Sequence, residues 1–252
     1  MPSDAVKVVV LGGGIGSRFS PDLPKQFHEV NGKPLVAHTL ERLSRIPWVD
    51  EICITYPEGY RELMSDIVGK YGLVKCTKIV QGGKCGTESA LFGLRSLAGY
   101  DGPVMIYAAN VPICDDDVFE SCMALFKEKG TAVSGEKAIY PTFQRIEGDV
   151  YRSIDRSTLY TTHVPQLYDY RKVMDVFEKC IPEGLEKFPN IPAMLCFLGE
   201  PIYFSDYHPN AIKITYRQDV EILTGYQLLD SKNNRRSHRC SPYRNPVSKA
   251  TE

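Results

Sequence analysis

The sequence predicts an α/β protein with a Rossmann-like three-layer arrangement, in which a mostly parallel central sheet lies between two layers of helices. The run at residues 6–11 is short, continuous and rich in valine, which is typical of a strand buried on both faces. Similar runs alternate with helical segments through the first half of the chain. Glycine-rich or polar segments follow several of these runs, at the end of the strands where parallel sheets bind ligands.

The first half of the chain alternates strand and helix without a break. We expect strands at 6–11, 51–56, 76–81 and 103–108, and helices near 35–45, 59–69, 87–97 and 115–128. Alternation of this kind places parallel strands side by side and covers both faces of the sheet with helices. The segments that follow the strands, including the glycines after residues 11 and 81 and the stretch 108–110, should therefore meet at one edge.

The pattern changes after residue 130. A strand is expected at 131–138, and residues 139–169 are rich in Tyr, Thr and Arg, which suits the substrate side of a cleft. A helix near 170–180, strands near 201–205 and 211–215 and a closing helix near 217–230 complete a single domain over residues 1–230. Residues 231–252 contain six Lys and Arg and one Glu without apolar periodicity, which predicts a disordered basic tail.

Composition limits the class of protein. With 252 residues, 43% hydrophobic content and a formal net charge of −1, the chain can bury one large core and has no broad charge for nucleic acid. The start, MPSDAVKVVV, lacks a basic signal region, and no apolar stretch reaches the roughly 18 residues of a membrane span, so we expect a cytoplasmic protein. Eight scattered cysteines without Cys-x-x-Cys spacing suggest neither disulfides nor zinc.

The segment after the first strand, GGGIGSRFSPDLPKQF at 12–27, favours binding of a nucleoside triphosphate. Clustered glycines let backbone N–H groups approach an anion, and Arg18 and Lys25 add positive charge. The dinucleotide-binding pattern G-x-G-x-x-G is absent because Ser17 occupies its third glycine position, and no Gly-Lys-Ser/Thr of a P-loop is present. A tight turn with solvated charges would explain the glycines alone, but Pro24, Lys25 and Gln26 favour the phosphate-binding interpretation.

The same residues carry a resemblance. The pattern GGGxGSRFxxxxPKQF, followed by Gly-Lys-Pro-Leu at 32–35, resembles the cytidylyltransferases that make CDP-methylerythritol or CDP-ribitol. Four further blocks occur in the family's order, so that the resemblance covers most of the chain: VQGGKCGTESALFGL (80–94), YAANVPICDDDVF (107–119), SIDRSTLYTTHVPQLY (153–168) and NAIKITYRQDVEIL (210–223). These enzymes belong to the nucleotidyltransferases with a nucleotide-diphospho-sugar transferase-like, or glycosyltransferase-A-like, fold.

The resemblance implies transfer of CMP from CTP to a polyol phosphate, with Mg²⁺ bound mainly through the triphosphate. It implies a homodimer whose arm lies within 139–169, and a role in isoprenoid or cell-surface polysaccharide biosynthesis. It implies catalytic roles for Arg18, Lys25 and Lys213, and acceptor binding by Thr142, Arg156 and Lys213. The implied nucleotide-binding residues are Leu11, Gly12, Gly13, Gly14, Gly16, Ser17, Gly82, Gly83, Lys84, Ser89, Ala109 and Asn110.

The chain departs from the family at several acidic positions. Ala108-Ala109-Asn110-Val111-Pro112 stands where the family has Asp-Ala-x-Arg-Pro, and Asn210 and Asn190-Ile191 stand where acidic residues are typical. Three interpretations stay open: a cationic cradle suffices for Mg²⁺-CTP, other residues such as Asp206, His208 or the run 115–117 replace the ligands, or the protein binds a cytidine nucleotide without turnover. The simpler account of residues 115–117 is a helix N-terminus. The GGGxGSR loop favours ribitol 5-phosphate over methylerythritol phosphate as acceptor.

Overall fold

A seven-stranded mixed sheet forms the centre of the computed structural model, which describes residues 5–14, 19, 22–205 and 212–233. The strand order is β11-β7-β10-β6-β1-β4-β5, and only β10 runs antiparallel to its neighbours. The predicted, mostly parallel sheet is therefore confirmed. The strands are β1 (Val6–Leu11), β4 (Val49–Tyr56), β5 (Cys76–Gln81), β6 (Pro103–Ala108), β7 (Thr131–Lys137), β10 (Tyr160–Asp169) and β11 (Phe204–Ser205).

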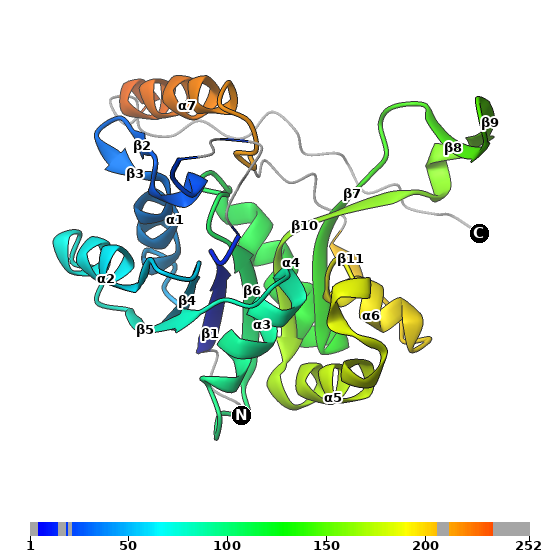
Figure 1. Ribbon diagram of the computed structural model, residues 1–252, viewed down its shortest axis with the longest axis horizontal. Helices are drawn as coiled ribbons and strands as arrows, with labels where there is room; N and C mark the ends of the chain where they lie inside the picture. The colour runs from blue at the N-terminus through cyan, green and yellow to red at the C-terminus, as the bar shows by residue number, and fades with distance from the viewer. Residues whose placement is uncertain (1–4, 15–18, 20–21, 206–211, 234–252) are drawn as a thin grey trace, which may run out of the picture.

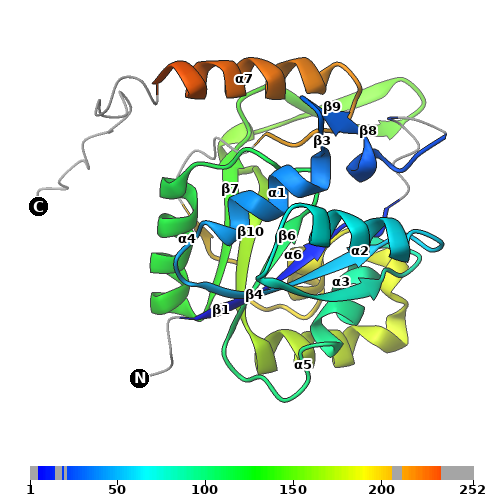
Figure 2. The same ribbon diagram turned by 90° about the vertical axis from the view of Figure 1, so that its left-hand side faces the viewer.

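Helices cover both faces of the sheet (Figures 1 and 2). Because side chains alternate along β1, Val8 and Val10 pack into the cluster on one face, whereas Val9 packs into the cluster on the other. The first cluster includes side chains of α1 (Leu35–Ser44), α2 (Arg61–Lys70) and α4 (Asp116–Lys129). The second includes side chains of α3 (Gly86–Arg95), α5 (Tyr170–Cys180) and α6 (Ile191–Phe197).

A third, smaller apolar cluster lies beyond the carboxyl ends of the parallel strands. It joins Phe19, Val30, Ile113 and Ile214 to Leu223 of α7 (Asp219–Asn233). In Figure 1, α7 lies above the short hairpin of β2 (Glu29–Val30) and β3 (Lys33–Pro34). This cluster holds the segment that precedes α7 against the sheet edge.

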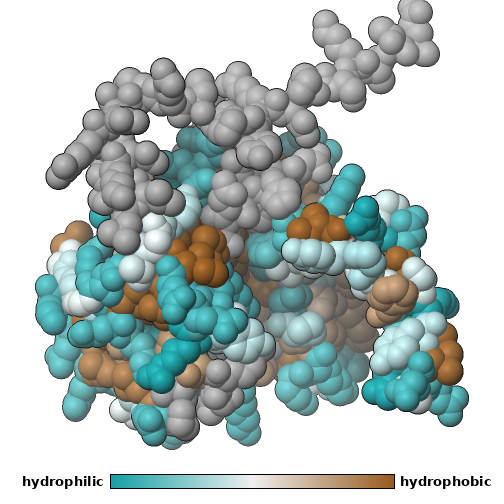
Figure 3. Space-filling model, turned by 90° about the horizontal axis from the view of Figure 1, so that it is seen from above, coloured by the Kyte–Doolittle hydropathy of each residue, from teal (hydrophilic) through white to brown (hydrophobic). Residues whose placement is uncertain are grey.

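An arm projects from the body of the molecule (Figure 1). It consists of the hairpin β8 (Thr142–Glu147) and β9 (Val150–Ile154), carried by the extended ends of β7 and β10 and followed by the 3-10 turn η2 (Arg156–Thr158). Its apolar side chains face solvent: Phe143 is 60% exposed and Val150 62%. Apolar surface is visible on this right-hand part of the molecule in Figure 3.

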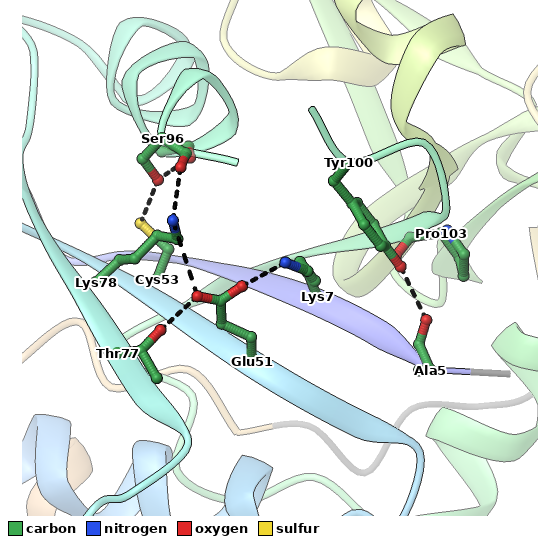
Figure 4. Close-up of polar contacts among 10 residues, drawn as sticks. Ala5, Lys7, Glu51, Cys53, Thr77, Lys78, Ser96, Tyr100 and Pro103 are labelled. Carbon is green, nitrogen blue, oxygen red and sulfur yellow. Dashed lines mark hydrogen bonds and ion pairs between the residues drawn. The ribbon is translucent and has the colours of Figure 1, made fainter. Parts of the chain in front are cut away.

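The amino ends of the parallel strands carry a network of paired polar groups (Figure 4). The Glu51 carboxylate accepts from Lys7 Nζ at 2.6 Å and from the Thr77 hydroxyl, and Lys78 Nζ lies 3.9 Å away. Partial burial opposes ionisation of Glu51, but the bonds from Lys7 and Thr77 outweigh it and hold the pKa of this carboxyl below its usual value. Burial, with help from nearby carboxylates, raises the pKa of Tyr100 to about 12, so its hydroxyl stays a donor to Ala5 O.

Most of the predicted helices and strands are confirmed, but the bounds of several differ from the prediction. Strands 76–81 and 103–108 and the helix 170–180 have the predicted bounds. The helix expected at 59 begins at Arg61, because Gly59 has a φ of +84°, which no α-helix contains. The strand expected near 201–205 shortens to β11, and near 211–215 the described residues form only a bridge from Ile212 to the loop residue Ile113.

The remaining differences concern the ends of elements and the tail. Helix α7 extends to Asn233, so the first three residues of the predicted tail are helical, and residues 234–252 lie outside the described part. The seven cysteines of the described part are all free thiols, as expected. Within the same part, no helix is long and apolar enough to cross a membrane. The short 3-10 turns are η1 (Lys25–Phe27), η3 (Ile181–Glu183) and η4 (Leu185–Lys187).

Candidate nucleotide-binding site

The segments that follow β1, β5 and β6 meet at the carboxyl edge of the sheet, as the sequence predicts. The Ala109 N–H donates to Leu11 O at 3.0 Å, which joins the loops after β6 and β1. The Gly12 N–H donates to the Thr55 hydroxyl at 3.0 Å. A Cβ on Gly12 would lie only 2.5 Å from the Thr55 carbonyl oxygen, so glycine is required here by close packing.

The glycine loop packs directly on the loop after β5. A Cβ on Gly82 would lie 2.8 Å from the Cα of Gly13, so the two backbones touch. The Ser89 hydroxyl, on α3, accepts from the Gly83 N–H at 3.0 Å and donates to Cys85 O at 2.9 Å. Ser89 is 3% exposed, and its role in the structure is to hold the 82–85 loop on the start of α3.

Gln26 fixes the shape of the glycine loop from the other side. Its amide nitrogen donates to the carbonyl oxygens of Gly12 and of Gly14, the latter at 3.0 Å. The side chain is 2% exposed. With two loop carbonyls held by the Gln26 amide and the Gly12 N–H held by the Thr55 hydroxyl, buried side chains order the start of the loop. The sequence pattern includes Gln26 but gives no sign of this role, because it depends on a contact across 12–14 residues.

The candidate catalytic lysines lie near the end of β6. Lys25 Nζ donates to Ile214 O at 3.4 Å, and the Asn110 amide nitrogen donates to the same oxygen at 2.6 Å. The Ile214 N–H donates to Asn110 O at 2.8 Å. Lys213 is exposed and adjacent to Ile214 in the chain. The structure therefore brings Lys25, Asn110 and the backbone that carries Lys213 to the same edge as the glycine loop.

Lys84 extends this edge toward a cavity of about 520 Å³ between α3 and the η3–η4 segment. The Lys84 side chain is exposed, and its backbone N–H donates to the Glu88 carboxylate at 2.6 Å. The Cys85 sulfur accepts from the Glu88 N–H at 3.4 Å and so caps α3. The carboxylate and the sulfur both bond to N–H groups at the start of this helix, which orders the loop below the cavity.

The predicted acceptor residues are not together within one chain. Thr142 and Arg156 lie on the arm and contact it locally: the Thr142 hydroxyl donates to Tyr140 O at 3.1 Å, and Arg156 donates to Ile139 O at 2.6 Å. Lys213 precedes Ile214, which is bonded to Asn110 on the body of the molecule. A phosphate site made of Thr142, Arg156 and Lys213 thus stays a prediction. Gly16, Ser17, Arg18, Asp206, His208 and Asn210 lie outside the described residues.

The acidic run 115–117 lies at a helix N-terminus, as the simpler interpretation predicts, since α4 begins at Asp116. The Asp115 side chain does not cap the helix, however; it accepts from the Tyr226 hydroxyl at 2.9 Å. Asp116 pairs with Arg42, whose Nε donates to Cys114 O at 2.9 Å. These carboxylates therefore join α1, α4 and α7 and have protein partners of their own.

Carboxylates suited to a resident metal are not grouped at this edge. Across residues 5–14, 19, 22–205 and 212–233, no three His, Cys, Asp or Glu side chains lie close enough to hold a metal ion. Ala108 ends β6, and Glu88 is already bonded to the Lys84 N–H. The described residues thus form no metal site of their own.

A parallel sheet whose carboxyl edge carries packed glycine loops and nearby lysines defines a nucleotide-binding α/β protein of the nucleotidyltransferase type. The family model of 2-C-methyl-D-erythritol 4-phosphate cytidylyltransferase (IspD) matches residues 6–226. The chain belongs to this family of cytidylyltransferases.

Curated relatives match over nearly their whole length. A ribitol-5-phosphate cytidylyltransferase of Lacticaseibacillus paracasei is 27% identical over 227 residues, which cover 88% of this chain and 97% of that protein. A 2-C-methyl-D-erythritol 4-phosphate cytidylyltransferase of Clostridium botulinum is 29% identical over 226 residues, covering 88% and 96%. Relatives of both names thus resemble the chain to a similar degree.

Solved structures confirm the fold. The 4-diphosphocytidyl-2C-methyl-D-erythritol synthase of Anaerococcus prevotii superposes with a TM-score of 0.76 at 19% identity, covering 89% of this chain and 98% of that one. The 2-C-methyl-D-erythritol 4-phosphate cytidylyltransferase of Francisella tularensis gives a TM-score of 0.71 at 21% identity, covering 88% and 99%. At these identities the likeness is one of fold.

Proposed function

We propose that this protein transfers CMP from CTP to a polyol phosphate and releases pyrophosphate, with ribitol 5-phosphate preferred over methylerythritol phosphate as acceptor. The observation that carries the proposal is the contact of three loops, after β1, β5 and β6, at one edge with Lys25 beside them. The acceptor preference rests on the GGGxGSR sequence of the glycine loop, and a relative named for ribitol 5-phosphate supports it.

The chemistry is an in-line displacement at phosphorus. An oxygen of the acceptor phosphate attacks the α-phosphorus of CTP, a new P–O bond forms, and the bond to the bridging oxygen of pyrophosphate breaks. A phosphate nucleophile is already ionised, so no general base is needed. The rate then depends on positioning and on neutralising the charge of the phosphates. In our proposal Lys25 and Arg18 supply this charge, Lys213 stabilises the attacking phosphate, and the glycine loop supplies N–H donors.

The loop after β5 is the proposed site of the cytosine and ribose. The N–H groups of Gly82 and Gly83 donate to Tyr56 O and to the Ser89 hydroxyl, which fixes the loop and leaves its carbonyl oxygens as the proposed acceptors for the base. Backbone carbonyl oxygens suit this role, because the amino group of cytosine is a hydrogen-bond donor. Lys84 is exposed at the rim, where its charge can reach the nucleotide.

Magnesium is proposed to arrive with the triphosphate. The described residues form no metal site of their own, and oxygen atoms of a triphosphate together with water are ligands that Mg²⁺ prefers. In this proposal the ion is held by the triphosphate and water.

We further propose a homodimer in which the arm of one copy completes the acceptor site of the other. Thr142 and Arg156 stand on an arm that points away from the body that carries Lys213 (Figure 1). The arm also exposes apolar side chains that a second copy would cover: Ile139, Tyr140, Phe143, Ile146, Val150 and Tyr151. The expected cytoplasmic location remains part of the proposal.

Pyrophosphate release tests the proposal. The protein is assayed with each of the four nucleoside triphosphates and with ribitol 5-phosphate, methylerythritol 4-phosphate and other polyol and sugar phosphates, with Mg²⁺ and after chelation. Release confined to CTP and ribitol 5-phosphate is the expected result. Release with methylerythritol 4-phosphate alone would correct the acceptor. Saturable CTP binding by calorimetry with no release for any acceptor would indicate a binding protein instead.

A further inference from the structure

Asn110 links the loop after β6 to the segment before α7. Its side-chain amide nitrogen donates to Ile214 O at 2.6 Å, and its backbone carbonyl oxygen accepts from the Ile214 N–H at 2.8 Å. The two residues are 104 positions apart, and Asn110 is only 6% exposed. A side-chain bond and a backbone bond thus join the same pair of residues, and together they fix both the position and the direction of the Ile214 peptide.

The Ile214 carbonyl oxygen has two donors of unequal strength. The Asn110 amide nitrogen lies 2.6 Å away, at the short end for a hydrogen bond, whereas Lys25 Nζ lies 3.4 Å away and makes only a long, weak one. Ile214 itself is 0% exposed and packs in the third apolar cluster. Because its carbonyl is held in a buried setting, leaving it without a donor would cost free energy.

We propose that Asn110 is a positioning residue for Lys25. By satisfying the Ile214 carbonyl, the Asn110 amide lets the Lys25 ammonium leave that oxygen for a phosphate without creating a buried unpaired acceptor. Without the amide, Lys25 is the remaining donor to Ile214 O and is held there in competition with the substrate. This inference rests on the proposed role of Lys25 in binding the triphosphate.

Asn110 acts on the protein and reaches the ligand only indirectly. Its amide nitrogen is committed to Ile214, so the effect on the nucleotide passes through Lys25. A residue that acts in this way has an effect only while Lys25 is present. That dependence separates positioning from direct contact with CTP and from a general contribution to stability.

Calorimetry with CTP and the full-length protein tests the proposal without any acceptor. Wild type, Asn110→Ala, Lys25→Ala and the double variant are compared. We expect Asn110→Ala to weaken CTP binding about 5- to 10-fold, the usual effect of one hydrogen bond, and to add less than about 2-fold on the Lys25→Ala background. Equal losses on both backgrounds, or wild-type affinity of Asn110→Ala, would overturn it.

Gln166→Ala is the matched control, because it removes another buried amide that donates to a backbone carbonyl. Gln166 is 7% exposed; its amide nitrogen donates to His163 O at 3.0 Å and its amide oxygen accepts from the Tyr168 hydroxyl at 2.9 Å, so both of these partners belong to its own strand, β10. We expect it to lower the thermal midpoint but leave CTP affinity unchanged. Asn110→Leu, which has a similar size but no donor for Ile214 O, provides a second variant if Asn110→Ala fails to fold, with the same expected loss. A wild type that binds none of the four triphosphates would instead contradict the proposed function, and the role of Asn110 with it.

Discussion

The two edges of the parallel sheet use opposite chemistry. At the amino edge, the charges of Glu51, Lys7 and Lys78 lie close together, and side-chain hydroxyls complete the network (Figure 4). At the carboxyl edge, the close contacts are between backbones, at Gly12 and Gly82, and buried side chains such as Gln26 and Ser89 bond to the loops. At the amino edge the charged groups are paired with one another. At the carboxyl edge, buried side chains bond to the loops on the side that faces the core.

This difference separates stability from function in one sheet. Paired charges at the amino edge contribute when both partners are present and offer nothing to a substrate. Loops fixed by buried side chains such as Gln26 and Ser89 are already in position when a ligand binds, so less order has to be created on binding. Removing a charged side chain at the amino edge should therefore change unfolding, and removing one at the carboxyl edge should change catalysis.

Lysine removal gives the largest expected contrast. Lys25→Ala should lower kcat about 100- to 1,000-fold, as loss of a charge-stabilising donor does in other enzymes, with little change in thermal midpoint, because its contact with Ile214 O is long at 3.4 Å. Lys7→Ala, at the amino edge, should keep the wild-type kcat but lower the midpoint, since it breaks the 2.6 Å pair with Glu51. Pyrophosphate release and thermal unfolding measure the two effects. Normal turnover of Lys25→Ala would contradict the division.

Substitution of a glycine at the carboxyl edge should have the next largest effect. Gly12→Ala places a Cβ 2.5 Å from the Thr55 carbonyl oxygen, so the loop must shift, with an expected loss of about 1–3 kcal/mol in unfolding free energy. Gly14→Ala is the control, because a Cβ there meets nothing within 4 Å. In denaturant unfolding, stability should fall for Gly12→Ala and stay close to wild type for Gly14→Ala. Similar behaviour of the two variants would mean that the loop is not held by this contact.

The carboxyl edge was largely predictable from the sequence, because its signals are local. Short valine-rich runs set the strands, and glycines directly after β1 and β5 mark the loops that meet there. Gln26 and Asn110 were visible in the motifs, but their partners were not. The bond from Asn110 to Ile214 spans 104 residues, and no local pattern encodes such a pair.

The acceptor side was less predictable for a different reason. Thr142 and Arg156 were chosen from a resemblance, and each now lies on a projecting arm with local contacts only. Composition could show that residues 139–169 are unusual, but the direction of a hairpin depends on where β7 and β10 leave the sheet. Glu51 carried no signal at all, since its partners come from the two neighbouring strands: Lys7 lies on β1, and Thr77 and Lys78 lie on β5.

The amino edge itself can be tested by neutralising its carboxylate. Glu51→Gln keeps the shape but loses the attraction to Lys7 and Lys78, and because the site is partly exposed we expect a loss of about 1–2 kcal/mol in unfolding free energy with unchanged kcat. The pKa of Glu51 is held below its ordinary value of 4.5, so this stabilisation is present above about that pH and is lost as the pH falls further. The unfolding free energies of wild type and variant, measured with denaturant, should therefore become equal as the pH falls below that value. A difference that persists into strong acid would show that shape, and not charge, is responsible.

Acid sensitivity at milder pH should come from His38, with the smallest effect. Burial lowers the pKa of His38 below its ordinary value of 6.5, although a bond with Val30 O opposes the shift. The unfolded chain therefore takes up the proton first, so stability is complete above about pH 6.5 and declines as the pH falls through the interval down to the folded-state pKa. His38→Gln can still donate to Val30 O but cannot titrate, and should remove part of the decline between neutral pH and pH 5.5 in denaturant unfolding. Because His38 lies on α1, away from the glycine loop, the same variant should leave CTP affinity at both pH values unchanged. An unaltered decline would assign the acid sensitivity to other groups.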